Sequence, residues 1–166
     1  MEALGRIIDL SIGFAPVDMQ TGANTGKRVS LRNAGGITFV FYKAAGTGGD
    51  DPVLTFQQHT ALSGGTTANL AIVDHYYSKS ATTLAGTETW TRTAQAAAAT
   101  VTLTGEAAKQ GIYVFEIESA SLSDTYNYCS LSVADTGGNA QLGCVLYELR
   151  DLEVRRKPAN LAAALS

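Results

Sequence analysis

The sequence predicts an all-β protein, folded as a single-domain β-sandwich of about eight strands that is similar to a jelly roll and has extended N- and C-terminal arms. Three observations lead to this prediction. Apolar and other residues alternate with a period of two in several segments, most clearly at residues 112–118, and such alternation is typical of β-strands. Glycine-rich breaks separate these segments at short intervals. No segment has the period of a long amphipathic helix.

The length indicates a single domain, and the low content of charged residues indicates a surface that contacts neighbouring molecules. A chain of 166 residues can form a substantial core, since chains of about 150 residues bury roughly 70% of their unfolded surface. Charged residues make up only 16% of the chain, against about 25% in a typical protein. We expect an N-terminal arm at residues 1–27, a β-sandwich domain at residues 28–150 and a C-terminal tail at residues 151–166.

The N-terminal arm carries one strand-like segment. Its apolar residues are Ile7, Ile8, Leu10, Ile12 and Phe14, which alternate in part. Pro16 and the polar run at residues 21–26 then interrupt the pattern. We expect this segment to pair either with an edge of the sheet or with another subunit.

Four strands are predicted in the first half of the domain. They lie at residues 29–32, 37–43, 53–59 and 69–79, with turns at residues 33–36, 44–51 and 63–65 between them. Residues 37–43 are apolar on both faces, which is typical of a strand in the middle of a sandwich or barrel. Pro52 favours extended backbone at the start of the third strand.

The second half of the domain begins with a short predicted strand at residues 88–93. The alanine run at residues 96–99 is expected to form a loop or an edge strand, because four alanines cannot offset the cost of helix nucleation. Residues 106–110 are expected to form one helical turn, which Gly111 ends. The clearest strand of the chain follows at residues 112–118.

The last two predicted strands are residues 126–134 and 140–150. The loop between them, residues 135–139, contains two glycines and an asparagine, which tolerate the positive φ that tight hairpin loops require. We therefore expect a hairpin.

The register of this hairpin decides where the two cysteines lie. A two-residue turn at Thr136 and Gly137 places Cys129 opposite Cys144, whereas a shift of one residue separates them. We expect small buried free cysteines, since two cysteines are too few for a disulfide framework and the cytosol keeps thiols reduced.

The C-terminal tail combines a basic run with an apolar end. Residues 155–157 form the basic run, and three charges are too few for a stripe that follows a nucleic-acid backbone. Beyond Pro158, two leucines enclose three alanines at residues 161–165. This end is expected either to form a helix or to stay disordered until it binds.

The charge of the chain and the length of its apolar runs argue against two classes of partner. The net charge is −3 at pH 7, whereas proteins that bind nucleic acid concentrate Lys and Arg. No stretch approaches the ~18 consecutive apolar residues that cross a bilayer, and no leader is visible at the N-terminus. We expect no direct contact with nucleic acid or with a membrane.

Two segments resemble phosphate or metal sites but lack part of the chemistry. Residues 22–28 have three residues between their glycines where a phosphate-binding loop has four, and Arg28 stands where Ser or Thr would bind magnesium. Asp50 and Asp51 follow two glycines, but no ladder of further oxygen ligands for calcium follows them. We predict no cofactor and no metal, and interpret both segments as turns or loops.

Acid–base chemistry has few candidates. Neither His59 nor His75 belongs to a spaced ligand pair, and alternation along a strand sends Asp74 and His75 to opposite faces. Glu116 and Glu118 share one face of a strand and are expected to face solvent, because glycosidase carboxylates usually come from different elements. The Gly-x-Ser-x-Gly motif of serine hydrolases is absent. We predict no catalytic residue and no enzymatic activity.

Two segments resemble small proteins that tailed bacteriophages encode near their capsid genes. They are residues 46–60, GTGGDDPVLTFQQHT, and residues 132–146, SVADTGGNAQLGCVL. The similarity covers about residues 27–149 and leaves both arms outside it. The resemblance implies a virion role as a head decoration, cement or minor capsid protein, commonly of jelly-roll type, and it transfers no catalytic residue.

The role implied is that of a structural protein that binds and stabilises the capsid shell. Its expected partners are the major capsid protein and further copies of the chain in a homo-oligomer, and its expected location is the virion, after assembly in the host cytoplasm. We expect the two arms to order on neighbouring subunits. The residues expected at these interfaces are Ile7, Ile8, Leu10, Ile12, Phe14, Arg155, Arg156 and Leu161.

Two other functions remain as alternatives. A carbohydrate-binding module of a phage tail or surface protein would use Trp90, Tyr76 or Tyr126 as a stacking platform. The other alternative is a hydrolytic enzyme on a sandwich fold. Coplanar aromatic side chains on one open face favour sugar binding, whereas apolar arms and a multi-subunit assembly favour the virion role.

Overall fold

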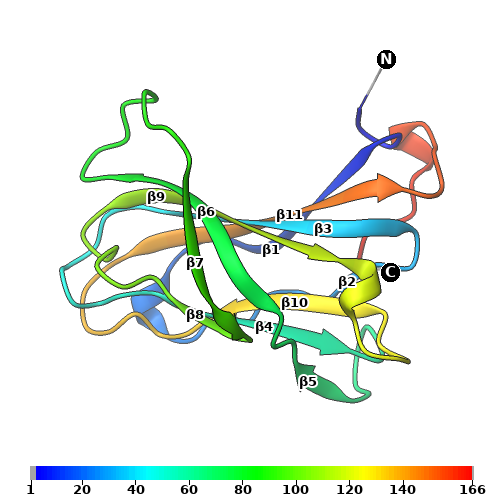
Figure 1. The fold of residues 1–166 in the computed structure, drawn as a ribbon, viewed down its shortest axis with the longest axis horizontal. Helices are drawn as coiled ribbons and strands as arrows, with labels where there is room; N and C mark the ends of the chain where they lie inside the picture. Colours follow the sequence, from blue (N-terminus) through cyan, green and yellow to red (C-terminus); the bar gives the residue numbers. More distant parts are fainter. Residues whose placement is uncertain (1–2, 166) are drawn as a thin grey trace.

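The computed structural model describes residues 3–165 and consists of two antiparallel β-sheets packed face to face (Figure 1). Its strands are β1 (Ile8–Asp18), β2 (Val29–Ser30), β3 (Ala34–Lys43), β4 (Val53–His59), β5 (Thr67–Asn69), β6 (Val73–Ala81), β7 (Thr91–Ala98), β8 (Thr100–Thr102), β9 (Gln110–Glu118), β10 (Tyr128–Val133) and β11 (Leu142–Leu152). Three short 3₁₀ helices are η1 (Met19–Thr21), η2 (Ser119–Ser121) and η3 (Pro158–Asn160). The prediction of an all-β chain is confirmed. Residues 1, 2 and 166 of the predicted arms lie outside the described residues.

The strands divide into two sheets of different size. Sheet A has six strands in the order β1-β11-β3-β9-β6-β7. Sheet B has the order β2-β10-β4-β5, and β8 also pairs with β4. Because β8 pairs with the first half of β4 and β5 with the second half, the two short strands share one edge.

Eight of the strands form nested antiparallel pairs, like the two halves of one long folded ribbon. The pairs are β1 with β11, β2 with β10, β3 with β9, and β4 with β5, so the first strand pairs with the last and the pairing proceeds inward. The ribbon rolls on itself, because β11 also pairs with β3 and β10 with β4. The strands β6 and β7 extend sheet A beyond β9 and run steeply across the view in Figure 1.

Aromatic side chains from both sheets meet in one core. Phe39 of β3 lies 5.5 Å from Phe56 of β4 and 5.1 Å from Tyr147 of β11, measured between ring centroids. Phe56 also lies 5.0 Å from Phe115 of β9. Aromatic contacts of this kind stabilise the fold beyond the burial of apolar area, so these rings join the two sheets.

Several predicted strands appear in the structure. The strand β4 has the predicted bounds, and β9 and β3 contain the predicted segments 112–118 and 37–43. The latter is a central strand of sheet A, as expected from its apolar faces. Most of the alanine run at residues 96–99 belongs to β7, so the edge-strand alternative holds.

Two local predictions are wrong. The segment 69–79 is not one strand, because the chain turns at residues 70–72 and passes from β5 in sheet B to β6 in sheet A. Residues 106–110 form hydrogen-bonded turns rather than a helical turn, with Lys109 N donating to Glu106 O at 3.1 Å.

The predicted hairpin at residues 126–150 is also wrong. Its two strands belong to different sheets, β10 to sheet B and β11 to sheet A, so the loop between them crosses from one sheet to the other. Backbone hydrogen bonds fasten this crossing to η1, because Thr136 N donates to Met19 O and Met19 N donates to Gln141 O. Cys129 is buried in sheet B, Cys144 lies in sheet A, and both are free.

Both predicted arms contact the sandwich. The N-terminal segment forms β1, the edge strand of sheet A, and pairs with β11, which is the intramolecular alternative of the two we considered. The C-terminal tail forms η3 and returns to the sandwich, where Ser30 N donates to Ala164 O at 3.0 Å. Arg156 N donates to Gly5 O at 2.8 Å, so the two ends of the chain are hydrogen-bonded to each other.

A buried lysine fastens the loop between β8 and β9. Lys43, the last residue of β3, donates from Nζ to the carbonyl oxygens of Glu106 at 2.8 Å, Ala107 at 3.1 Å and Lys109. Burial lowers the pKa of Lys43 from 10.5 to about 8, so the ammonium is protonated at pH 7 and each of its three N–H groups has an acceptor. Asp51 holds the same loop by accepting hydrogen bonds from two of its backbone N–H groups.

We predict that Lys43→Met lowers the free energy of unfolding by about 2–4 kcal/mol, because buried carbonyl oxygens lose their donors. The matched control is Lys109→Met, which removes a more exposed ammonium 2.8 Å from Glu106 and is expected to cost less than about 1 kcal/mol. Urea denaturation followed by circular dichroism measures both variants. Equal losses in the two variants would contradict the role assigned to Lys43.

Candidate interaction surfaces

An apolar row crosses the outer face of sheet A. In five neighbouring strands, side chains that point away from the core lie opposite one another in the order Ile12, Leu146, Val40, Val114 and Tyr77. Side chains directly opposite in an antiparallel pair have Cβ atoms about 4.5–5.5 Å apart, so the row is continuous. The apolar row ends at β7, where Arg92 lies opposite Tyr77.

A second outward row lies beside the first and contains Cys144, Tyr42 and Ile112. Leu146 and Tyr42 each expose 47% of their surface, and Leu10 and Leu142 expose 57% each. Adjacent large apolar side chains with this exposure make this face a candidate interaction site. The outer apolar surface is defined here as Leu10, Ile12, Val40, Tyr42, Ile112, Val114, Leu142 and Leu146.

Most of this surface was missed by sequence reasoning. Val40, Tyr42 and Leu146 are not among the predicted interface residues. For Val40 and Tyr42, the signal in the sequence is that residues 37–43 are apolar on both faces, which we interpret as burial on both sides. The strand is central, but its outward side chains are only partly covered, and Tyr42 is exposed.

The predicted interface residues of the N-terminal segment lie in three environments. Leu10 and Ile12 belong to the outer apolar surface, and Ile8 precedes them on the same side of β1, opposite Arg150 of β11. An irregularity in β1 between Ile12 and Phe14 shifts the register, and Phe14 packs against the core. Ile7 is exposed just before the strand.

The predicted residues of the tail lie beside the N-terminal segment. Arg155 and Arg156 line an open hollow of about 580 Å³ together with Arg6, Ile7 and Lys157. We call these five residues the terminal basic region. The fold thus combines cations from both ends of the chain, which the sequence presents as separate.

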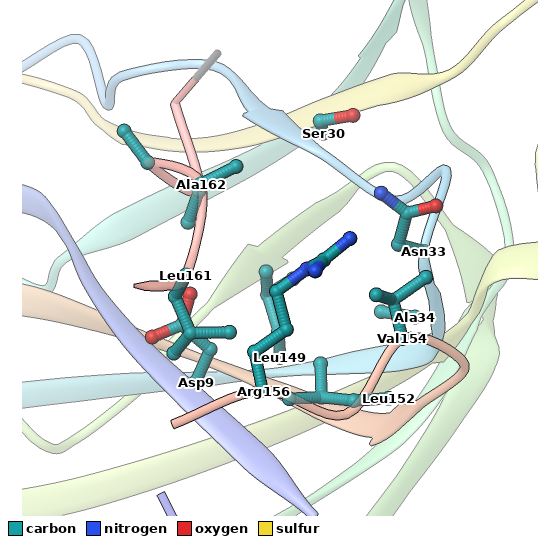
Figure 2. Close-up of a pocket in the computed structure, with 12 residues that line it drawn as sticks. Asp9, Ser30, Asn33, Ala34, Leu149, Leu152, Val154, Arg156, Leu161 and Ala162 are labelled. Carbon is teal, nitrogen blue, oxygen red and sulfur yellow. The ribbon is translucent and has the colours of Figure 1, made fainter. Parts of the chain in front are cut away.

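A second hollow, of about 380 Å³, adjoins this region. The Arg156 side chain extends into it, with Leu161 on one side and Asn33 on the other in Figure 2. Gly5 permits this approach of the two ends, because a Cβ atom added there would lie 2.5 Å from Arg156 O and 3.2 Å from Leu161 Cδ1. The backbone at Gly5 also has a φ of +78°, which side chains disfavour.

A third hollow opens on sheet A where β6 meets β9. Its volume is about 280 Å³, and its lining residues are Tyr77, Trp90, Val114 and Glu116. Trp90 lies directly before β7 and exposes 50% of its surface. Lys79 Nζ lies 4.8 Å from the centroid of the Trp90 ring, within the range of a cation–π contact.

The predicted aromatic platform is not formed as expected. Tyr76 points into the core, where its ring centroid lies 5.3 Å from that of Phe115. Tyr126 lies in the loop before β10. The aromatic side chain that shares a hollow with Trp90 is Tyr77, one position along the strand and therefore on the opposite face from Tyr76.

A buried histidine connects two strands of sheet B. His59 Nε2 lies 2.8 Å from Ser130 Oγ, and His59 Nδ1 lies 2.9 Å from Thr67 Oγ1. Arg28 donates to Thr67 Oγ1 at 3.2 Å and to two carbonyl oxygens of the loop between β4 and β5. Ser130 is only 1% exposed, so a substrate cannot reach its hydroxyl, and the histidine and serine brace the sheet.

The second histidine contradicts its prediction. Alternation was expected to send Asp74 and His75 to opposite faces, but His75 Nδ1 lies 2.6 Å from Asp74 Oδ1. The pairing of β6 with β7 is irregular at this point, because Val73 lies opposite Ala98 and His75 opposite Ala94, so Asp74 lies outside the regular register. The hydrogen bond from His75 lowers the pKa of Asp74 below its ordinary value. The pair is exposed, and His75 also packs edge-on against Tyr77.

The remaining carboxylates brace turns or face solvent. Asp50 accepts a hydrogen bond from Asn139 Nδ2 at 3.0 Å, while Asp51 holds the loop beside Lys43. Glu116 is exposed as expected, and Glu118 forms an ion pair with Arg150 at 2.5 Å. Among residues 3–165, no group of three or more His, Cys, Asp or Glu side chains is placed to bind a metal ion.

Comparison of the chain with protein-family models, with curated proteins and with solved structures finds no match. In the described part of the chain, no helix has the length and apolar character needed to span a bilayer.

We predict that the free energy of unfolding falls as the pH drops from 7 towards 4. Burial, with Arg28 nearby, lowers the pKa of His59 from 6.5 to about 4. Between these values the unfolded chain takes up a proton that the folded chain does not, so acid favours unfolding by up to about 3 kcal/mol.

Urea denaturation at pH 7, 6 and 5 measures this dependence. His59→Gln is expected to lose the part of it between pH 6.5 and 5, whereas the matched control His75→Gln keeps it. The same slope in His59→Gln as in the unchanged protein would contradict the assignment.

Proposed function

We propose that this chain is a structural virion protein that binds and stabilises the capsid shell of a tailed bacteriophage. The proposed partners are the major capsid protein and further copies of the chain in a homo-oligomer. The proposed location is the virion, with assembly in the host cytoplasm. The resemblance of residues 46–60 and 132–146 to small capsid-associated phage proteins supports this proposal.

The pairing of the strands supports a jelly-roll assignment within this proposal. A jelly roll is an eight-stranded double sheet, and it recurs in viral capsid domains. The eight strands β1–β5 and β9–β11 pair first with last and proceed inward, as expected for a ribbon rolled into two sheets. We propose that β6, β7 and β8 are additions to this eight-stranded arrangement.

The outer apolar surface is the observation that carries the proposal. A protein that works in isolation gains nothing from exposing Leu146, Tyr42 and Leu10 on the same face of a sheet. A shell protein recovers about 25 cal/mol for each Å² of this apolar area that its partner covers. Because a shell repeats the same site many times, copies that also contact one another bind with added avidity.

The buried polar groups are consistent with a non-enzymatic role. The ammonium of Lys43 donates only to backbone carbonyls, and the His59 ring lies between two hydroxyl side chains. Both groups have shifted pKa values, which in an enzyme can mark a catalytic site. Neither side chain lines any of the three hollows described above.

We predict that Leu146→Glu weakens binding to the shell at least about tenfold, because a charge within the apolar row would be buried without a partner. The matched control is Thr100→Glu, which places the same charge on an exposed position of β8 in sheet B. Cosedimentation with shells of the major capsid protein encoded by the same phage measures binding. Equal binding by Leu146→Glu and the unchanged protein would contradict the proposal.

The terminal basic region is a second contact in this proposal. We predict that joint replacement of Arg155 and Arg156 by Ser weakens shell binding more at low salt than at high salt, because salt screens exposed charges. The same cosedimentation at two salt concentrations measures the difference. A loss independent of salt would show that the two arginines do not act through their charge.

A further inference from the structure

We propose that the hollow at Trp90 binds one pyranose ring of a neutral saccharide. In this arrangement, the rings of Trp90 and Tyr77 contact the C–H face of the sugar, and the carboxylate of Glu116 accepts hydrogen bonds from its hydroxyl groups. This site adjoins the outer apolar surface, with which it shares Val114, but the sugar-binding proposal does not depend on the shell contact.

The hollow arises from the way β6 leaves β9. The two strands pair from Ala81 opposite Gln110 to Tyr77 opposite Val114, and beyond this point no residue of β6 pairs with β9. Glu116, two residues further along β9, therefore has a pairing partner on β3 but none on β6. The hollow lined by Tyr77, Trp90, Val114 and Glu116 lies where the two strands separate.

Its two aromatic side chains are held in place without a ligand. The Trp90 ring lies 4.8 Å from Lys79 Nζ, and the Tyr77 ring packs edge-on against His75 with centroids 5.6 Å apart. The loop before Trp90 is fastened by Glu88, which accepts hydrogen bonds from two of its backbone N–H groups. Side chains fixed in this way lose little conformational entropy when a ligand binds.

The lining selects the chemistry of the ligand. A pyranose has an apolar C–H face and a rim of hydroxyl groups, which match aromatic rings beside a carboxylate that only accepts hydrogen bonds. The exposed carboxylate of Glu116 disfavours acidic sugars and phosphates by charge repulsion. The volume of about 280 Å³ is smaller than a typical drug-sized pocket of about 300–1,000 Å³, which suits one ring.

Trp90 is the single tryptophan of the chain, so tryptophan fluorescence reports on this hollow alone. The test titrates the unchanged protein with glucose, galactose, N-acetylglucosamine and the β-linked disaccharides cellobiose and lactose. We expect at least one of these sugars to shift the emission to shorter wavelength in a saturable way, with a Kd of about 1 mM. No saturable change with any of the five sugars would overturn the proposal.

Three variants locate the binding. Glu116→Gln keeps the tryptophan and is expected to raise the Kd about fivefold, because a charged acceptor is replaced by a neutral one. Trp90→Ala, measured by calorimetry, is expected to weaken binding at least about tenfold. Tyr42→Ala is the matched control: it removes another exposed aromatic side chain of sheet A that does not line the hollow, and the Kd should not change.

The outcomes separate the two proposals. An unchanged Kd in both Glu116→Gln and Trp90→Ala would place the sugar elsewhere and overturn the saccharide site. Circular dichroism of each variant confirms that the fold is intact. Loss of shell binding by Leu146→Glu with sugar binding retained supports two binding sites on neighbouring parts of sheet A, whereas failure of either assay alone affects only its own proposal.

Discussion

The pairing of the first strand with the last is the constraint on which the rest of the structure depends. β11 lies between β1 and β3, so sheet A cannot be completed until the C-terminal part of the chain is in place. Closing a loop that includes nearly the whole chain costs entropy, which core burial has to offset. Tyr147 is one residue through which β11 contributes to this core. Its ring packs on Phe39, and its hydroxyl donates to Lys27 O and accepts from Leu131 N of sheet B.

The same constraint creates the outer apolar surface. Ile12, Leu146 and Val40 come from distant parts of the sequence, and only the order β1-β11-β3 makes them neighbours. Polar groups meanwhile occupy the interior, where Lys43 and His59 fasten a loop and a sheet. Hydrogen bonds offset the cost of burying these polar groups and hold the body rigid, whereas the exposed apolar side chains of sheet A leave hydrophobic area in water. Together they are consistent with a rigid body whose outer surface is covered by a partner.

Local pattern was sufficient for several strands but not for their partners. Residues 53–59 and 112–118 alternate clearly and appear as β4 and β9, whereas the expected hairpin at residues 126–150 crosses between sheets. Glycine and asparagine permit a tight turn but do not require one, and hydrogen bonds to η1 decide the outcome. The contact between Asp74 and His75 and the hollow at Trp90 were also beyond the sequence. Both depend on where β6 changes register or leaves its neighbour, which is set by tertiary packing.

Cryo-electron microscopy of the intact phage particle tests the central claim most directly. The account predicts density for this chain at repeated positions on the capsid shell, with β1, β11 and β3 facing the major capsid protein or another copy of the chain. Leu146 and Tyr42 should then be covered. Purified particles that lack the chain, or density in which this face of sheet A is open to solvent, would contradict the account.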